Sequence, residues 1–181
     1  MMERMLRHLR ETEDKDAILR EMMEKYGKEI WHYAYLMTRS SDAADDIAQD
    51  VFLKAYRGLY SFRGDSSLRT WLLTIARNTS LSAIKTETLR RLVTLRLIRR
   101  QPHRNGPSAE AEFMARHATS RLWRIVLGLP RKLREVLVLE AHYQMKQTEI
   151  ARLLGISPGT VKSRLHRARA QVSSRMKEET E

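Results

Sequence analysis

The fold is decided by residues 147–168, QTEIARLLGISPGTVKSRLHRA, which predict two short helices joined by a tight turn. Apolar residues recur at helical spacing through 147–154, so the first helix has one face to bury. Gly155 suits the left-handed backbone that ends a helix, and Ser157 followed by Pro158 is a typical cap and first residue of the next helix. The stretch therefore predicts a helix-turn-helix.

The second helix of this motif has two unlike faces. Val161, Leu165, Ala168 and Val172 form an apolar stripe, and the opposite side is polar and basic. In a helix-turn-helix the second helix enters the major groove of DNA, where its side chains reach base edges and phosphates. The alternative, a helix pair that only stabilises a bundle, leaves the exposed cations without a role. The residues expected to face DNA are Lys162, Ser163, Arg164, His166, Arg167 and Arg169.

The composition is that of a folded protein without disulfides. The chain has 181 residues, 42% of them hydrophobic, and no cysteine, so neither a disulfide framework nor a thiolate zinc site is available. No apolar run approaches the roughly 18 residues that span a bilayer, and the N-terminal MMERMLRHLRETEDKD is too charged for a signal peptide. We expect a cytoplasmic protein with no stable membrane insertion.

Positive charge gathers in the second half of the chain. The net charge is +12, yet residues 1–86 carry 14 Lys and Arg against 13 Asp and Glu, whereas residues 87–181 carry 20 against 9. An excess of this size on helices favours a polyanionic partner, because each neutralised phosphate releases condensed counterions. The alternative is a basic surface that serves only solubility.

Helical spacing of apolar residues extends through nearly the whole chain, and strict alternation is scarce. The sequence predicts an all-α protein of two small helical domains joined by a flexible linker, the C-terminal one containing the helix-turn-helix. The linker candidate is RRQPHRNGPSAEAE, with its prolines, glycine and switch from basic to acidic residues. We place the domains at 1–88 and 112–181, with the linker at 89–111. The expected helices are 16–38, 42–59, 66 to about 86, 109–127, 131–142, 147–154 and 158–177.

The helix expected at 42–59 carries an acidic face opposite an apolar stripe. The stripe runs from Ala44 to Ala55 and can pack inward. An exposed leucine among carboxylates is typical of a docking surface. Aspartates that only stabilise the positive end of the helix dipole explain the first turn, but explain Asp50 and Leu53 poorly. The residues that share this outer face are Asp46, Gln49, Asp50 and Leu53.

The stretch YSFRGDSSLRTWLLTIARN, residues 60–78, combines a polar loop with a helix that bears aromatic, arginine and amide side chains. Ser66 or Ser67 can cap this helix. Such groups can hold an unstacked base by stacking and by hydrogen bonds to its edge. The alternative assigns Trp71 to the core and Asp65 to a turn, and composition alone favours that alternative.

Two blocks of sequence then matter together: DAADDIAQDVFLKAYRGLYSFRGDSSLRTWLLTIARN and, after the linker, LPRKLREVLVLEAHYQMKQTEIARLLGISPGTVKSRLHRARAQV. In this order they resemble a bacterial extracytoplasmic-function (ECF) sigma factor, a small two-domain type of the sigma-70 family. The resemblance covers about residues 15–175. It implies a subunit that directs core RNA polymerase to specific promoters and assists strand opening, while polymerase does the chemistry.

The resemblance also assigns roles to matching positions. The acidic helix is similar to the segment that docks on the clamp helices of the polymerase β′ subunit, the loop resembles the part that captures a flipped minus-10 base, and the last helix matches the reader of the minus-35 element. It places Arg164 and Arg169 on phosphates. The implied polymerase-binding residues are Asp45, Asp46, Gln49, Asp50 and Leu53, and the implied minus-10 residues are Phe62, Arg63, Gly64, Asp65, Ser66, Ser67, Trp71 and Asn78.

The chain departs from the family at KTETLRRLVTLRLIRRQPHRNG, which is basic and apolar where family linkers are often more polar and acidic. Either the last helix of the first domain continues to about Arg99, or the segment is extended in a polymerase channel. A basic amphipathic segment can also bind an anionic membrane surface or an acidic partner. Free sigma factors of this type are commonly held by an anti-sigma factor, for which the segment is a candidate contact.

The sequence shows no catalytic constellation, no glycine-rich phosphate loop, and no metal-ligand spacing among its six histidines. We therefore expect no enzymatic activity, no cofactor and no small-molecule substrate. Two rival interpretations are a stand-alone helix-turn-helix regulator and a helical adaptor that meets an acidic protein. The lack of a ligand-pocket signature and of a dimerisation stripe counts against the regulator.

Overall fold

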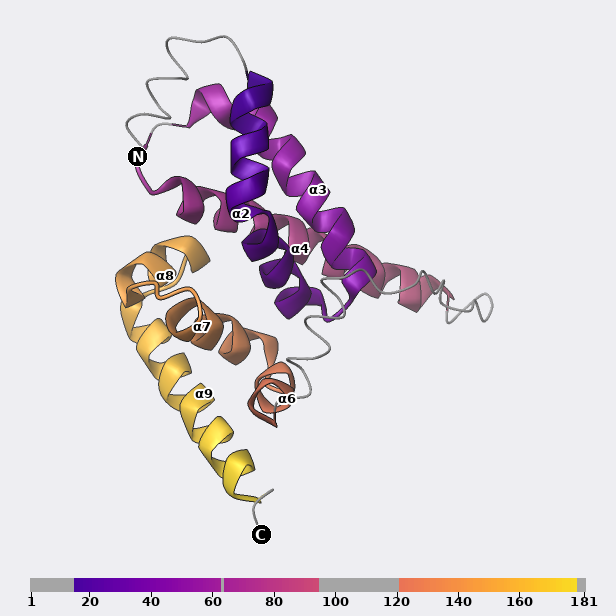
Figure 1. The fold of residues 1–181 in the computed structure, drawn as a ribbon. Helices are drawn as coiled ribbons and strands as arrows, with labels where there is room; N and C mark the ends of the chain where they lie inside the picture. Colours follow the sequence, from indigo (N-terminus) through magenta and orange to yellow (C-terminus); the bar gives the residue numbers. More distant parts are fainter. Residues whose placement is uncertain (1–14, 63, 95–120, 179–181) are drawn as a thin grey trace. The chain divides into compact units, whose positions relative to one another are not determined.

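The computed structural model describes residues 15–62, 64–94 and 121–178, and every regular element within these ranges is a helix (Figure 1). The chain divides into two compact units, with the division between Gly106 and Pro107. The all-α, two-domain prediction is confirmed. No helix in the described ranges is long and apolar enough to cross a membrane.

In the part of the first unit that the structure describes there are three long helices, each of which packs against the other two. A single turn of 3₁₀ helix, η1, follows the second of them. Burial of large apolar side chains stabilises the unit, at about 1.5–3 kcal/mol for each one fully buried. Those at the centre of its core include Met22, Ile30, Tyr33, Val51, Leu59, Leu72 and Leu73. The element bounds are α2 (Lys15–Thr38), α3 (Ser41–Gly58), η1 (Leu59–Ser61) and α4 (Leu68–Thr94).

Serine caps set the starts of α3 and α4. The Ser40 hydroxyl accepts a hydrogen bond from the backbone N–H of Ala43 at 3.3 Å, and the Ser67 hydroxyl accepts one from Thr70 at 3.1 Å. Caps of this kind contribute about 1 kcal/mol each. Of the two serines that the sequence offered as caps for α4, Ser67 takes the role, so the loop before α4 ends at a fixed point.

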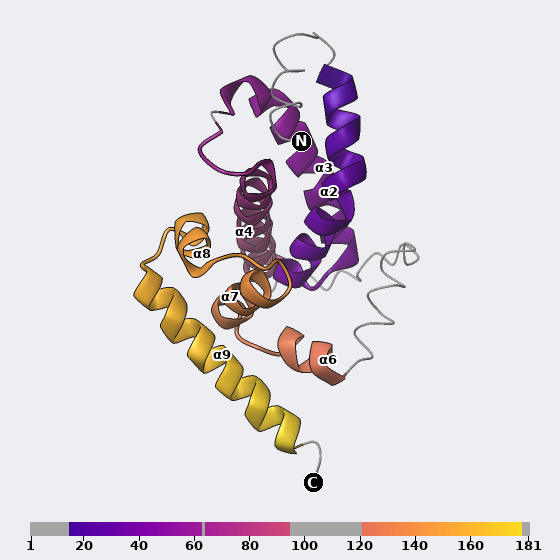
Figure 2. The same cartoon turned by 60° about the vertical axis from the view of Figure 1, so that its left-hand side comes forward.

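Among the described residues of the second unit, 121–178, the longest helix is α9, which contacts α6, α7 and α8 (Figure 2). The predicted apolar stripe of α9 is confirmed, because Val161, Leu165 and Ala168 are buried. Ala168 packs with Leu129 and Leu133 in one hydrophobic cluster. The element bounds are α6 (Arg121–Leu127), α7 (Arg131–Ala141), α8 (Gln147–Leu154) and α9 (Pro158–Glu178).

The turn between α8 and α9 has the predicted chemistry. Gly155 adopts φ 65°, a left-handed conformation that glycine enters without a steric penalty. The Ser157 hydroxyl accepts a hydrogen bond from the backbone N–H of Thr160 at 3.1 Å, at the start of α9. These two features end one helix and begin the next within three residues, so α8 and α9 form the helix-turn-helix.

Helix ends agree closely with the sequence analysis except at α4. This helix continues to Thr94, past the end expected near residue 86, because no glycine or proline interrupts residues 86–94 and most of them are good helix formers. Residues 95–120 lie outside the described ranges, and with them the whole linker candidate RRQPHRNGPSAEAE and the start of the helix expected at 109–127. The domain bounds 1–88, 89–111 and 112–181 stay predictions.

Candidate nucleic-acid and protein interfaces

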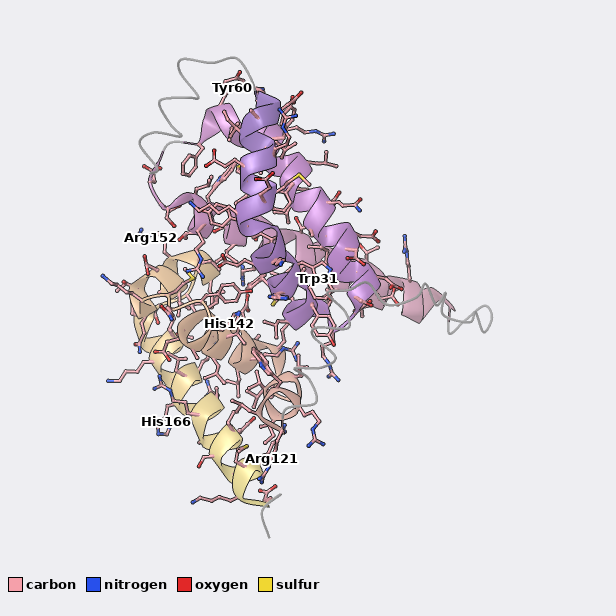
Figure 3. The ribbon with its side chains drawn as sticks, in the orientation of Figure 1. Trp31, Tyr60, Arg121, His142, Arg152 and His166 are labelled. Atoms are coloured by element: carbon pink, nitrogen blue, oxygen red, sulfur yellow. The ribbon has the colours of Figure 1, made fainter. Side chains whose placement is uncertain are left out.

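The polar side of α9 is exposed over its first half. Lys162, Ser163, His166 and Arg167 are exposed, and Arg164 is half-buried. Figure 3 shows His166 projecting outward from α9. Because the opposite side of the helix is buried in the unit, these side chains form an exposed basic face on a helix, an element that the major groove can admit.

Local hydrogen bonds order part of this face. The Ser163 hydroxyl donates to the carbonyl of Thr160 at 3.0 Å, and Nε of Arg167 donates to the carbonyl of Ser163 at 3.4 Å. The second bond lays the arginine stem along the helix and engages only Nε. Arginine contacts a guanine edge through two N–H groups of its fork, so this geometry suits base contact by Arg167.

Arg169 has different surroundings from the rest of the predicted DNA-facing set. Its guanidinium forms an ion pair with Glu140 of α7. A phosphate contact by Arg169 has to share or replace this pair. The phosphate contact of Arg169 stays a prediction, and we expect Glu140 to compete with the phosphate for the Arg169 guanidinium.

Exposed cations on the neighbouring helices escaped the sequence analysis. Arg152 on α8, labelled in Figure 3, is exposed, as are Arg131 and Lys132 at the start of α7. In a helix-turn-helix the first helix crosses the DNA backbone, so Arg152 is suited to a phosphate. The sequence did indicate that Arg152 is exposed, because it lies between the apolar residues Ile150 and Leu153 but not on the helix face that they share.

The acidic side of α3 borders a hollow of about 380 Å³ between α3 and α4. Asp46, Gln49, Asp50 and Leu53 line it together. Leu53 is 51% exposed, so an apolar side chain lies at the surface among carboxylates. The sequence analysis missed the contribution of α4, whose signal was a helical spacing of small and polar residues: Thr79, Ser82, Ala83 and Thr86.

The residues Asp46, Gln49, Asp50 and Leu53 form the acidic patch of α3. Its neighbours Asp45 and Lys54 bond to other residues of the unit. Asp45 accepts a hydrogen bond from the indole N–H of Trp31 at 2.6 Å, which anchors α3 to α2. Lys54 lies 3.5 Å from a carboxylate oxygen of Asp50 and donates to the Thr79 hydroxyl at 3.0 Å. Asp45 therefore has a structural partner, whereas the carboxylate of Asp46 lines the hollow.

The loop before α4 brings two aromatic rings together. The ring centroids of Phe62 and Trp71 are 5.1 Å apart, with the planes tilted by 45°. The alternative interpretation assigned Trp71 to the core. The residue is half-buried, so part of its ring belongs to the core and part is exposed. Gly64, at φ 78°, turns the chain between the two aromatic residues.

The polar members of the predicted base-binding set lie around this pair. Gly64, Asp65 and Ser67 are exposed and Ser66 is half-buried. Asn78 is exposed on α4 seven residues after Trp71, which places both on one side of the helix. Arg63 lies outside the described residues. The described members thus comprise an aromatic pair, a largely exposed polar loop, and an exposed amide on the same side of α4 as Trp71.

Comparison with known proteins assigns both units. The family model Sigma-70 region 2 matches residues 22–90, and the model Sigma-70, region 4 matches residues 119–172. The chain is 32% identical to RNA polymerase sigma factor YlaC of Bacillus subtilis, over 90% of this chain and 93% of YlaC. It is 31% identical to ECF RNA polymerase sigma factor SigM of Mycobacterium tuberculosis, over 84% of this chain and 74% of SigM. The chain belongs to the sigma-70 family as an ECF sigma factor.

A solved structure supports the fold of this sigma factor. The sigma factor RpoE, in complex with the anti-sigma factor NepR from Bartonella quintana, matches with a TM-score of 0.69 at 22% identity, covering 87% of this chain and 96% of that one. The resemblance found in the sequence is confirmed, and the stand-alone regulator is not favoured. As a sigma factor the chain serves transcription initiation with core RNA polymerase and promoter DNA. In the part of the chain that the structure describes, no group of three His, Asp or Glu could hold a metal ion.

Proposed function

We propose that this sigma factor divides promoter recognition among three surfaces. The acidic patch of α3 docks on the β′ clamp helices of core polymerase, the surface around the Phe62–Trp71 pair captures a base of the minus-10 element, and α9 reads the minus-35 element. The observation that carries the proposal is the exposed basic face on a helix whose other side is buried, in a chain that matches sigma-70 regions 2 and 4.

Docking through α3 follows from its charge and its exposed leucine. Asp46 and Asp50 present carboxylates to a basic partner, and Leu53 offers apolar surface that a partner can bury. Half of a leucine side chain removed from water contributes on the order of 1 kcal/mol. The charges favour the correct orientation and speed the encounter, while the leucine adds affinity that salt does not screen.

Base capture follows from the aromatic pair and from the amide on the same side of α4. Unstacking and unpairing one base costs a few kcal/mol. Stacking on an aromatic side chain returns about 1–3 kcal/mol, and hydrogen bonds from a group such as Asn78 select which base is held. A surface that holds one base therefore lowers the cost of strand opening and selects the sequence opened.

Duplex reading belongs to α9. Lys162, Ser163, His166 and Arg167 face bases, and Arg164 faces a phosphate. Arg152 of α8 adds a second phosphate contact. In this division of roles the chain itself makes and breaks no bond, and polymerase performs the chemistry in the cytoplasm.

An anti-sigma partner completes the proposal. The second unit has an apolar hollow of about 410 Å³ between α6, α7 and α9, with Leu122 half-exposed at its edge. Apolar surface of this kind is suited to a partner helix. We propose that an anti-sigma protein covers this hollow when the sigma factor is not bound to polymerase.

The docking role is tested with the double variant Asp46→Arg and Asp50→Arg. Reversing two charges in the patch is expected to weaken association with core polymerase by about tenfold or more, roughly 1.4 kcal/mol. Co-elution with core enzyme in size-exclusion chromatography measures this, and circular dichroism checks that helix content is retained.

The matched control is Glu21→Arg with Glu24→Arg, which makes the same charge change at exposed positions of α2 in the same unit. This control is expected to co-elute as the wild type does. Equal co-elution of the two double variants would remove α3 from the docking surface.

A further inference from the structure

We propose that Glu140 is a positioning residue for DNA recognition. By holding Arg169 it keeps this cation away from DNA phosphates and so limits DNA binding that does not depend on sequence. The inference rests on the proposed role of α9 on duplex DNA and deepens it. None of the three surfaces of the proposed function includes Glu140.

One carboxylate joins three helices of the second unit. Oε1 of Glu140, in the last turn of α7, accepts a hydrogen bond from Nε2 of Gln147 at 3.1 Å. Oε2 pairs with the guanidinium of Arg169. Gln147 is the first residue of α8, and Arg169 lies midway along α9. Glu140 therefore links both helices of the helix-turn-helix to α7.

The two side chains of the pair differ in exposure. The Glu140 side chain is 21% exposed, whereas the Arg169 side chain is 60% exposed. The carboxylate is held in place by Gln147 and by its own burial, while the guanidinium stays at the surface. The guanidinium is accessible to a DNA phosphate, but a phosphate has to displace the partly buried carboxylate of Glu140 in order to bind it.

Arg169 lies at the border of the DNA-facing side. Together with Gln147, Lys162 and His166 it lines a hollow of about 440 Å³ between α8 and α9. It also lines the apolar hollow on the other side of α9. Without the negative charge of Glu140, the guanidinium can turn toward Lys162 and His166 and meet a phosphate.

A phosphate contact adds affinity on every sequence alike, whereas base contacts act only on the correct one. Holding Arg169 back therefore raises the ratio of specific to non-specific binding. This makes Glu140 a determinant of specificity although it lies on α7, outside the helix that reads bases.

The test uses Glu140→Gln in the full chain. Glutamine keeps the volume and an acceptor oxygen for Gln147 but removes the charge that holds Arg169. The matched control is Glu178→Gln at the end of α9, where the carboxylate accepts a hydrogen bond from Ser174 at 2.7 Å. Both variants raise the net charge by the same amount.

Fluorescence anisotropy on a short duplex of mixed sequence, over a series of salt concentrations, measures the effect. Glu140→Gln is expected to bind about three- to tenfold tighter at low salt, with a salt slope steeper by about 0.9, the value for one added phosphate contact. Glu178→Gln is expected to change affinity by less than about twofold and to leave the slope unchanged.

Two further variants connect the gain to Arg169. Arg169→Gln alone is expected to leave non-specific affinity and salt slope near wild type, because the wild-type protein withholds this cation. Adding Arg169→Gln to Glu140→Gln is expected to cancel the gain. The single variant keeps the test decisive if Glu140→Gln fails to fold.

Equal behaviour of Glu140→Gln and Glu178→Gln would overturn the inference and leave the DNA role of α9 intact. A lower salt slope in Arg169→Gln alone would also overturn it, since Arg169 would already contact phosphate. A wild-type chain without salt-dependent duplex binding, both alone and in complex with core polymerase, would overturn the DNA role of α9 itself, and the inference with it.

Discussion

At the scale of the residue, periodicity predicted which side chains face outward but not what they touch. The exposed positions of α9 follow from the 3.6-residue repeat, so Lys162 and Arg167 were predictable. The bond from Trp31 to Asp45 and the pair of Arg169 with Glu140 join residues 14 and 29 positions apart. Such contacts depend on how helices cross, which local spacing does not encode.

Ser80 gives a test at the same scale. It is fully buried in α4, and its hydroxyl has no hydrogen-bond partner among the described residues. Leaving a buried hydroxyl unsatisfied costs about 1–3 kcal/mol. Ser80→Ala is therefore expected to raise the free energy of unfolding of the first unit by about 1 kcal/mol, measured by thermal or urea denaturation.

Ser82→Ala serves as the control, because Ser82 is exposed two residues later on the same helix. It reports the small gain in helix propensity that both substitutions share. A Ser80→Ala protein no more stable than the Ser82→Ala protein would show that the buried hydroxyl carries no penalty.

At the scale of the element, caps and turn residues predicted most helix ends. Ser157 and Gly155 fix the turn of the helix-turn-helix, and the structure has both in the expected roles. The end of α4 was harder to predict because residues 86–94 contain helix formers without a stop signal. When a helix lacks a stop signal, tertiary packing and solvation determine where it ends, and neither can be predicted from the spacing of residues in the sequence.

The start of α8 lacks a side-chain acceptor at its cap. The Glu149 carboxylate accepts a hydrogen bond from the backbone N–H of Lys146 at 2.8 Å, which is half of a capping box. The other half needs an oxygen on the Lys146 side chain, and an ammonium group cannot accept. Lys146→Ser is expected to complete the box and raise the free energy of unfolding by about 0.5–1 kcal/mol.

Urea denaturation of the Lys146→Ser and Lys146→Ala proteins isolates this effect, because both lose the lysine and only one gains a hydroxyl. Serine is expected to be the more stable of the two despite the higher helix propensity of alanine. Equal stability, or an alanine variant that is more stable, would mean that the start of α8 needs no further acceptor.

At the scale of the whole molecule, the helical spacing of apolar residues and the linker composition predicted the two helical units, and the order of the two motif blocks carried the resemblance to the family. The docking patch was predictable in part, since the outer face of α3 follows from its repeat while the contribution of α4 depends on helix packing. The linker composition departs from the family, and linker residues 95–111 lie outside the described ranges. The assignment of each surface to a promoter element stays a prediction that transcription can test.

The most direct measurement is transcription in vitro by core polymerase on a pool of genomic fragments, with and without this chain, followed by sequencing of the transcript starts. The account predicts starts that depend on the chain and share an upstream element, and an Arg167→Ala chain whose preference weakens at one base position of that element by about 1–3 kcal/mol. Starts that do not change when the chain is added, or an Arg167→Ala chain that loses activity equally on all sequences, would contradict it.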